Sequence, residues 1–272
     1  MAWAVETITA ANTAGISARA DALVAADTSG GLQEFRALAG RAAAGTNVSA
    51  EKIRCFDETD AVLDARSFDI WQQKGDRAAG LREFEKRQQE WFPRRVAFES
   101  LWEGGEAFRY LALNAGGLGT QGPYGKFCLV TTRVADVRRP VAVFPGDSLQ
   151  RYTSSTGVDV ALVQREAAAW AVRGAVAAIE RGTEALATGR ADWPAVICRP
   201  GSYLEVVVGP PLPLADLDEV RLPSSYLDTL QKYERLDLAR RRLTERQANE
   251  LRAFRGLQRW RRTYGIAITP LP

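Results

Sequence analysis

Short apolar runs are interspersed irregularly with longer amphipathic segments along this chain of 272 residues, and this order is what most constrains its fold. Regular alternation of strands and helices predicts a parallel sheet, whereas an irregular mixture favours an α+β fold. We therefore predict a mixed, mainly antiparallel sheet with strands at 52–56, 108–113, 126–132, 141–144, 195–198 and 203–208. Segments 81–91 and 163–186 have apolar residues at helical spacing and are expected to flank this sheet as helices.

Composition divides the chain into three predicted parts. Residues 1–50 are rich in Ala, Thr and Gly and are expected to form a helical N-terminal arm. Residues 51–222 hold the predicted strands and form an α+β core, the candidate catalytic domain. Residues 223–272 are expected to form a basic helical segment packed on that core. Between residues 231 and 262, eleven Lys or Arg stand against four Asp or Glu, a net charge of +7, while the whole chain carries only +3.

The chain contains no histidine, which limits the chemistry it can perform. Ser-His-Asp and Cys-His catalysis and histidine-bound zinc are excluded. Cys55, Cys128 and Cys198 are dispersed in apolar runs, which predicts buried thiols and excludes an all-cysteine metal site. No metal is therefore expected. Catalysis would depend on carboxylates, hydroxyls, arginines and backbone amides, or on a cofactor.

The sequence also bears on the expected compartment. It has no run of about 18 consecutive apolar residues, so neither a membrane span nor a membrane partner is expected. Its first fifteen residues lack a basic stretch ahead of an apolar one, which argues against a signal peptide. The expected compartment is the cytoplasm.

A glycine pattern typical of dinucleotide-binding loops, Gly-x-Gly-x-x-Gly, occurs at residues 117–122. In a Rossmann fold the pattern follows a strand and opens a helix, so that a pyrophosphate meets the helix N-terminus. Here Pro123-Tyr124-Gly125 and a strand-like run follow instead. The pattern is therefore interpreted as a glycine-rich hairpin loop, whose backbone amides remain able to contact a ligand.

Three separated positions carry residue types suited to binding NAD and breaking its glycosidic bond. Arg54 lies in the run 52–56, the hydroxyl cluster 153–156 follows in the middle of the chain, and Glu205 lies in the run 203–208. An arginine can hold a pyrophosphate bidentately. A glutamate beside the ribose can stabilise the positive charge that develops as the glycosidic bond breaks, which requires no histidine.

This order resembles the arginine–serine–glutamate triad of NAD-dependent ADP-ribosyltransferases, and segment 202–223 is most similar to toxin-type members that modify nucleic acid. The resemblance implies NAD as substrate, with Glu205 as the catalytic residue and Arg54, Tyr124, Ser154 and Ser155 around the cofactor. Tyr124 would stand where other members carry histidine. Tyr203 stands where arginine-modifying members carry Glu or Gln, which disfavours protein arginine as the acceptor.

The same resemblance implies a toxin or defence protein that transfers ADP-ribose to a nucleic acid or a protein, with an antitoxin or immunity protein as a further partner. A purely structural interpretation stays open for the same residues. In that interpretation Arg54 is a surface residue of a strand, the cluster 153–156 is a turn, and Glu205 is a solvated strand position.

An alternative function depends on the basic segment between residues 231 and 262. In this alternative the protein is not an enzyme and binds nucleic acid or a partner through that segment. The candidate phosphate contacts are Arg241, Arg242, Arg246, Arg259 and Arg262. Trp260 and Tyr264 are candidate stacking platforms for bases. A solvated amphipathic helix explains the pattern equally well, with a buried stripe of Leu238, Leu243, Leu251, Phe254 and Leu257.

Overall fold

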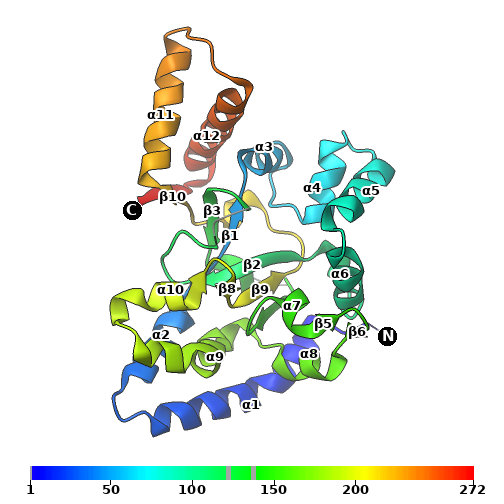
Figure 1. Ribbon diagram of the computed structural model, residues 1–272, viewed down its shortest axis with the longest axis vertical. Helices are drawn as coiled ribbons and strands as arrows, with labels where there is room; N and C mark the ends of the chain where they lie inside the picture. Colours follow the sequence, from blue (N-terminus) through cyan, green and yellow to red (C-terminus); the bar gives the residue numbers. More distant parts are fainter. Residues whose placement is uncertain (1, 121–123, 136–138) are drawn as a thin grey trace.

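A seven-stranded sheet organises the computed structural model, which describes residues 2–120, 124–135 and 139–272 (Figure 1). From edge to edge its strands are β11 (Ala267–Leu271), β10 (Glu219–Pro223), β3 (Phe127–Thr131), β1 (Ala43–Val48), β2 (Arg109–Asn114), β9 (Glu205–Val208) and β4 (Val141–Phe144). All neighbouring strands are antiparallel except β10 and β11, which are parallel. The predicted α+β fold with a mixed, mainly antiparallel sheet is confirmed.

One face of the sheet, called the apolar face, is apolar along most of its length. Residues opposite each other on neighbouring antiparallel strands share a face, so this face carries Leu111 with Val206, and Leu129 with Val220. Toward β4 it is packed against α1 (Val5–Ala26), α2 (Gly31–Arg41), α9 (Arg173–Ala187) and α10 (Trp193–Ile197). Toward β10 it is packed against α3 (Ala50–Thr59), α11 (Ser224–Leu238) and α12 (Glu245–Tyr264).

The opposite face, called the polar face, changes character across the sheet. Near β4 it is apolar, and Phe144 and Val207 pack against α6 (Trp91–Glu99), α7 (Ser148–Tyr152) and α8 (Val160–Glu166). Toward β10 it carries the polar side chains of Asn47, Asn114, Glu219 and Arg221, and on β9 it carries Glu205, opposite Phe144. Side chains two apart in a strand point to the same face, as Glu219 and Arg221 do on β10.

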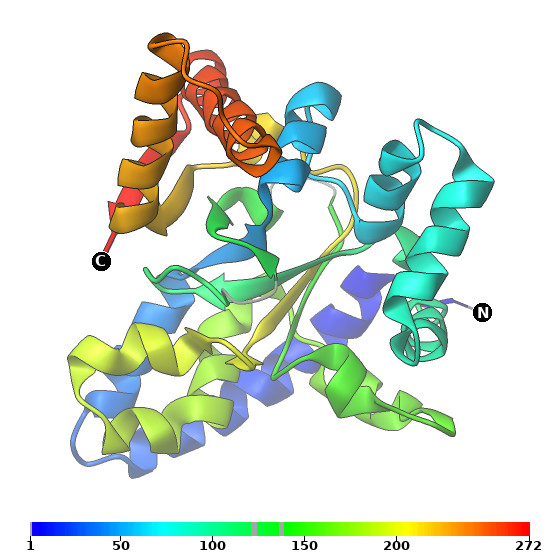
Figure 2. The same ribbon diagram turned by 45° about the horizontal axis from the view of Figure 1, so that its top comes forward.

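Two further helices, α4 (Ala65–Gln72) and α5 (Arg77–Gln88), lie beside α6 at one side of the molecule, across α3 from α11 and α12 (Figure 2). Asp64 caps α4 by accepting hydrogen bonds from the amides of Arg66 and Ser67 at 2.9 and 3.0 Å. Short hairpins are formed by β5 (Thr153–Ser154) with β6 (Gly157–Val158), and by β7 (Cys198–Arg199) with β8 (Ser202–Tyr203). Short 3-10 turns occur at Gly105–Ala107, Arg133–Ala135, Trp170–Val172, Arg190–Asp192 and Leu214–Asp216.

The predicted strand at 52–56 is wrong, because these residues lie inside α3. Ser49 begins this helix by accepting a hydrogen bond from the Lys52 amide at 3.3 Å. The run at 195–198 is also largely helical: Pro194 stands in the first turn of α10, and only Cys198 enters a strand. In the run at 203–208, β9 begins at Glu205 and Tyr203 belongs to β8.

The predicted helix at 163–186 is interrupted, since α8 ends at Glu166 and α9 begins at Arg173. Between them Ala168 exchanges two backbone hydrogen bonds with Val143 of β4, at 2.8 and 3.0 Å. These bonds hold the chain against the edge of the sheet, so the helix cannot continue through this point. The helix predicted at 81–91 is confirmed over residues 81–88 as part of α5, but its predicted end is wrong, because Gln89 has a φ of 49° and Trp91 begins α6. The strands predicted at 108–113, 126–132 and 141–144 are confirmed as β2, β3 and β4.

Strand formation at both ends of the chain was not predicted. Residues 43–48, expected in a helical arm, form β1 at the centre of the sheet between β2 and β3. Residues 224–262 are helical as expected, but they form two helices separated by residues 239–244. Residues 267–271 then form β11. None of the helices in the described parts of the chain has the length and apolar content that a membrane span requires.

Candidate functional site

A cavity of about 400 Å³ lies over the polar face of the sheet, where β1, β2 and β9 run side by side. Its floor follows one cross-strand row: Gly45 on β1 is opposite Ala112 on β2, and Ala112 is opposite Glu205 on β9. Gly45 and Ala112 have little or no side chain, so they leave space above the sheet beside the longer Glu205. We call this space the Glu205 cavity.

The walls of the Glu205 cavity come from segments that are far apart in the sequence. Trp91 and Arg95 come from α6, Tyr124 comes from the loop between β2 and β3, and Asp147 precedes α7. Its polar and aromatic lining is Thr46, Asn47, Gln88, Trp91, Arg95, Tyr110, Thr120, Tyr124, Asp147, Gln150, Tyr203 and Glu205. The lining thus combines four aromatic rings with carboxyl, amide, hydroxyl and guanidinium groups.

Glu205 is the most perturbed acid of this cavity. Its side chain is 3% exposed, and its Oε2 accepts a hydrogen bond from the Ser148 amide at 3.1 Å. Burial, together with the negative charge of Asp147, raises the pKa of Glu205 to about 8. The expectation of a solvated strand position for Glu205 is therefore wrong. At neutral pH this carboxyl group is therefore protonated in most of the molecules.

Asp147 holds two walls of the cavity in place. Its Oδ1 accepts hydrogen bonds from the Leu149 and Gln150 amides at 3.0 and 3.1 Å, which begins α7. Its Oδ2 accepts a hydrogen bond from the Tyr203 hydroxyl at 3.0 Å. Burial and the neighbouring carboxyl groups raise the pKa of Tyr203, so its hydroxyl stays protonated and remains a donor.

Arg95 is the cation of the cavity wall. Its Nε donates to Glu99 Oε1 at 2.9 Å, and the Tyr110 hydroxyl donates to the same oxygen at 3.0 Å. The Arg95 guanidinium lies 4.4 Å from the centre of the Tyr110 ring. Arg66 Nη2 lies 2.5 Å from the other oxygen of Glu99, which is 3% exposed. The buried Glu99 carboxylate, which is shared by two arginines, therefore fixes the position of the Arg95 guanidinium in the cavity wall.

A second cavity of about 520 Å³ adjoins the first. The two share Thr120, Tyr124, Asp147, Gln150 and Tyr203 as a common rim. The second cavity adds Arg151, Glu180 and Arg181 from beyond this rim. Arg151 pairs with Glu166 at 2.6 Å, whereas Arg181 Nε is buried without a hydrogen-bond partner among the described residues. We call this space the Arg181 cavity.

The loop between β2 and β3 crosses over β1 and carries Tyr124 to the rim. The expected hairpin is wrong, because β2 and β3 both pair with β1 and not with each other. Residues 121–123, including the last two of the glycine pattern, lie outside the described residues. Gly125 has a φ of +126°, and a Cβ there would lie 2.1 Å from the Val48 carbonyl oxygen, so only glycine fits this crossing.

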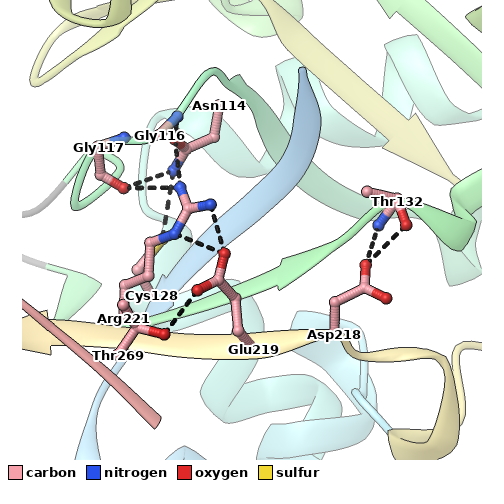
Figure 3. Close-up of polar contacts among 9 residues, drawn as sticks. All are labelled: Asn114, Gly116, Gly117, Cys128, Thr132, Asp218, Glu219, Arg221 and Thr269. Carbon is pink, nitrogen blue, oxygen red and sulfur yellow. Dashed lines mark hydrogen bonds and ion pairs between the residues drawn. The ribbon is translucent and has the colours of Figure 1, made fainter. Parts of the chain in front are cut away.

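A polar network at the β10 side of the sheet holds this loop (Figure 3). Arg221 Nη1 donates to Asn114 Oδ1 at 3.0 Å and to the Gly117 carbonyl at 3.2 Å. The same Asn114 oxygen accepts hydrogen bonds from the Gly116 and Gly117 amides at 3.0 and 2.9 Å. Arg221 also pairs with Glu219 at 2.5 Å. The network therefore positions the loop that forms one wall of the Glu205 cavity.

Two of the five residues predicted around NAD, Glu205 and Tyr124, line the same cavity. Arg54 does not, because it lies in α3, where its Nη1 donates to Asn249 at 2.8 Å. Ser154 and Ser155 are exposed in the β5–β6 hairpin, away from the cavity lining. The predicted arginine–serine–glutamate arrangement is thus not assembled, since its arginine was assigned to a strand that is a helix.

Several residues of the cavity were not found from the sequence. Asn47, Arg95, Asp147 and Tyr203 were not assigned to a site. Glu205 carried a usable signal, because a single acid within an otherwise apolar strand needs a partner or a function. Asn47 carried none, because its strand was not predicted. Arg95 and Asp147 had no such signal.

The three thiols are buried, as predicted. Burial raises the pKa values of Cys55, Cys128 and Cys198 to about 12, so none is a reactive thiolate near neutral pH. In the described parts of the chain no group of three or more Cys, Asp or Glu side chains is arranged to hold a metal ion.

The five arginines predicted to contact phosphate, Arg241, Arg242, Arg246, Arg259 and Arg262, are all exposed on α12 or on the segment before it. The expected stacking role of Trp260 is wrong, because the ring is 1% exposed and its Nε1 donates to Asp57 at 2.9 Å. The expected burial of Leu238 is also wrong, since it is 75% exposed.

The chain matches no protein-family model, and no curated protein matches it.

Proposed function

We propose that this protein binds NAD, with the nicotinamide riboside end in the Glu205 cavity, and transfers ADP-ribose to an acceptor. The supporting observation is the buried carboxyl group of Glu205 among the rings of Trp91, Tyr110, Tyr124 and Tyr203. Flat aromatic walls suit a planar pyridinium ring, and a cation is attracted to the faces of aromatic rings. A volume of about 400 Å³ is typical of small-molecule sites.

In the proposed reaction the bond between ribose C1′ and the nicotinamide nitrogen breaks. Its electron pair leaves with neutral nicotinamide, and positive charge develops on the ribose. The acceptor then forms a bond to C1′ and loses a proton. The Glu205 carboxylate stabilises the developing charge and accepts a hydrogen bond from a ribose hydroxyl, which is electrostatic stabilisation by a group already in place.

The raised pKa of Glu205 sets a condition on this role. A protonated carboxyl group cannot stabilise positive charge, so the reactive form is the carboxylate. The positively charged nicotinamide ring, once bound, would favour ionisation of Glu205 because opposite charges stabilise each other at short range. Arg95 acts in the same direction from the cavity wall and lowers this pKa.

The Arg181 cavity is proposed to take the phosphates of the dinucleotide. It continues from the Glu205 cavity across the shared rim of Tyr124 and Asp147. The Arg181 guanidinium makes no hydrogen bond or ion pair with any described residue, so it is free to bind an anion. This role replaces the one expected for Arg54.

The acceptor is proposed to be a nucleic acid or a protein, and the biological role that of a toxin or defence protein held in check by an antitoxin or immunity partner. This part of the proposal depends on the resemblance of segment 202–223 to toxin-type ADP-ribosyltransferases.

The deciding experiment incubates the protein with NAD and measures released nicotinamide by chromatography, with DNA, RNA and protein acceptors added in turn. The variant Glu205→Gln keeps the size of the side chain and an oxygen for the Ser148 amide, and it should lose release. The matched control Glu34→Gln removes a carboxylate from a surface ion pair with Arg190 and should keep release. Absence of nicotinamide with every acceptor, together with no NAD binding by calorimetry, would refute the proposal.

A further inference from the structure

The α11–α12 hairpin carries more than the whole net positive charge of the protein. Residues 224–264 contain eleven Lys or Arg and five Asp or Glu, a net charge of +6, against +3 for the full chain. The hairpin stands at one end of the molecule, beside α3, in both views (Figures 1 and 2). The rest of the chain is therefore net negative, and the positive charge is concentrated on one structural unit.

Four arginines form a row on α12. Arg252, Arg255, Arg259 and Arg262 follow each other at intervals of three, four and three residues. Residues three or four apart share one face of a helix, so these side chains lie along one side over about 15 Å, at 1.5 Å per residue. The opposite side carries Phe254, Leu257 and Trp260, which are buried. The row therefore faces away from the core.

Carboxylates neutralise only part of this row. Arg255 pairs with Asp237 at 2.7 Å, and Arg259 pairs with Asp57. Both arginines remain about half exposed, and exposed ion pairs are weak enough for a phosphate to replace the carboxylate. Arg252 and Arg262 are exposed and make no ion pair with the described residues.

The segment at the tip of the hairpin adds further cations. Arg240, Arg241 and Arg242 are exposed between α11 and α12, and none pairs with a carboxylate among the described residues. Like charges so close together repel each other unless an anion binds. The segment from Arg240 to Arg262, which holds the tip and the row, contains nine arginines and only two acids, Glu245 and Glu250.

We propose that this basic surface, the tip with the α12 row, binds the phosphate backbone of duplex nucleic acid. Regularly spaced arginines on an exposed helix suit a polyanion with regularly spaced phosphates. Trp260 is buried, so its ring cannot stack on unpaired bases, and the Tyr264 hydroxyl donates a hydrogen bond to Asp60. Contacts to phosphates alone carry no base-sequence information, which implies binding with little sequence preference.

The test measures fluorescence anisotropy of a labelled 20-base-pair DNA duplex with the full chain at 50 to 300 mM NaCl. A phosphate contact changes the logarithm of the affinity by about −0.9 per logarithm of salt, so each contact is worth roughly eightfold between 1 M and 0.1 M salt. The test variant replaces Arg241, Arg242, Arg252 and Arg262 with Gln. The matched control replaces Arg41, Arg77, Arg82 and Arg165 with Gln, four exposed arginines outside the hairpin.

The test variant should bind more than tenfold more weakly at 0.1 M NaCl, with a flatter salt dependence, while the matched control should stay within about threefold of the unmodified protein. Thermal melting of both variants checks that they remain folded. We expect them to remain folded because all of the replaced side chains are exposed. Three outcomes would each overturn the proposal. The two variants weaken binding equally, the duplex does not bind at 50 mM NaCl, or the protein binds vesicles of anionic lipid in place of DNA. The measurement uses no NAD, so its outcome is independent of the proposed reaction.

Discussion

Replacing Glu205 with Gln should change how the stability of the protein depends on pH. The folded protein raises the pKa of Glu205 to about 8, from about 4.5 for a free glutamate. The native state therefore keeps a proton that the unfolded chain has lost over this interval. It follows that Glu205 contributes most to stability below about pH 4.5, and that this contribution is lost as the pH rises through about 8.

The size of the effect follows from the two pKa values. One unit of pKa difference corresponds to about 1.36 kcal/mol. Between pH 6 and pH 8 the unfolded chain has already released the proton, whereas the folded protein releases it only near the upper limit. The free energy of unfolding should then fall by about 2 kcal/mol over these two pH units because of Glu205 alone. Glutamine does not ionise, so the variant should lack this decrease.

Urea denaturation at pH 6, 7 and 8, followed by tryptophan fluorescence, measures the effect. The difference in unfolding free energy between the protein and Glu205→Gln should shift by about 2 kcal/mol in favour of the variant from pH 6 to pH 8. The chain has no histidine, so few other side chains titrate in this interval. Glu34→Gln, at a half-exposed position, should run parallel to the unmodified protein. Parallel curves for Glu205→Gln would show that the carboxyl group is hydrated or already ionised.

Three further predictions concern the reaction, the loop and the hairpin. The kcat/KM for NAD should rise about tenfold per pH unit below about pH 8 and level off above it, because the free protein must lose the Glu205 proton; a flat profile would contradict the assigned role. Arg221→Gln should lower the free energy of unfolding by about 1–3 kcal/mol and speed amide hydrogen exchange at Gly116 and Gly117. The control Arg133→Gln, at a more exposed arginine, should change neither. Unchanged exchange in Arg221→Gln would mean that Arg221 does not hold the loop. Leu257→Ala, at a 1% exposed position, should cost about 2–5 kcal/mol in chemical denaturation, whereas Leu238→Ala should change stability by less than about 0.5 kcal/mol; equal costs would mean that α12 is not packed as described.

The sequence predicted the fold where local pattern and tertiary context agree. The run 141–144 is a strand with the predicted ends, because its four residues are apolar and both of its faces are buried. β1 was missed because Ala-Ala-Gly-Thr-Asn-Val has few large or branched side chains, and its place in the sheet comes from pairing with β2 and β3. The run 52–56 shows the reverse error, since a short apolar stretch fits a helix as well as a strand.

The candidate site was predictable only where a residue stands out from its local sequence. Glu205 was recognisable as an acid within an apolar strand, and Tyr124 as the aromatic residue of a glycine-rich loop. Arg95 reaches the cavity through helix packing, and Asp147 reaches it as the N-cap of α7. A local pattern can indicate such a cap but not its position beside Glu205. Arg54 has the expected residue type, but α3 directs it to Asn249. Residue type can thus be read from sequence, whereas convergence in space depends on non-local pairing.

One cross-strand row connects the cavity with the network that holds its wall. Gly45 lies opposite Ala112 on one side and Val130 on the other, and Val130 lies opposite Glu219. A Cβ at Gly45 would lie 3.2 Å from Asn114 Nδ2, the side chain that binds the loop and Arg221. A larger residue at this position would therefore both fill the floor of the cavity and press on the anchor of the loop. The same small residue gives Glu205 its space and leaves Asn114 in place to bind Gly116 and Gly117, so the shape of the cavity and the anchor of the loop depend on a single strand position.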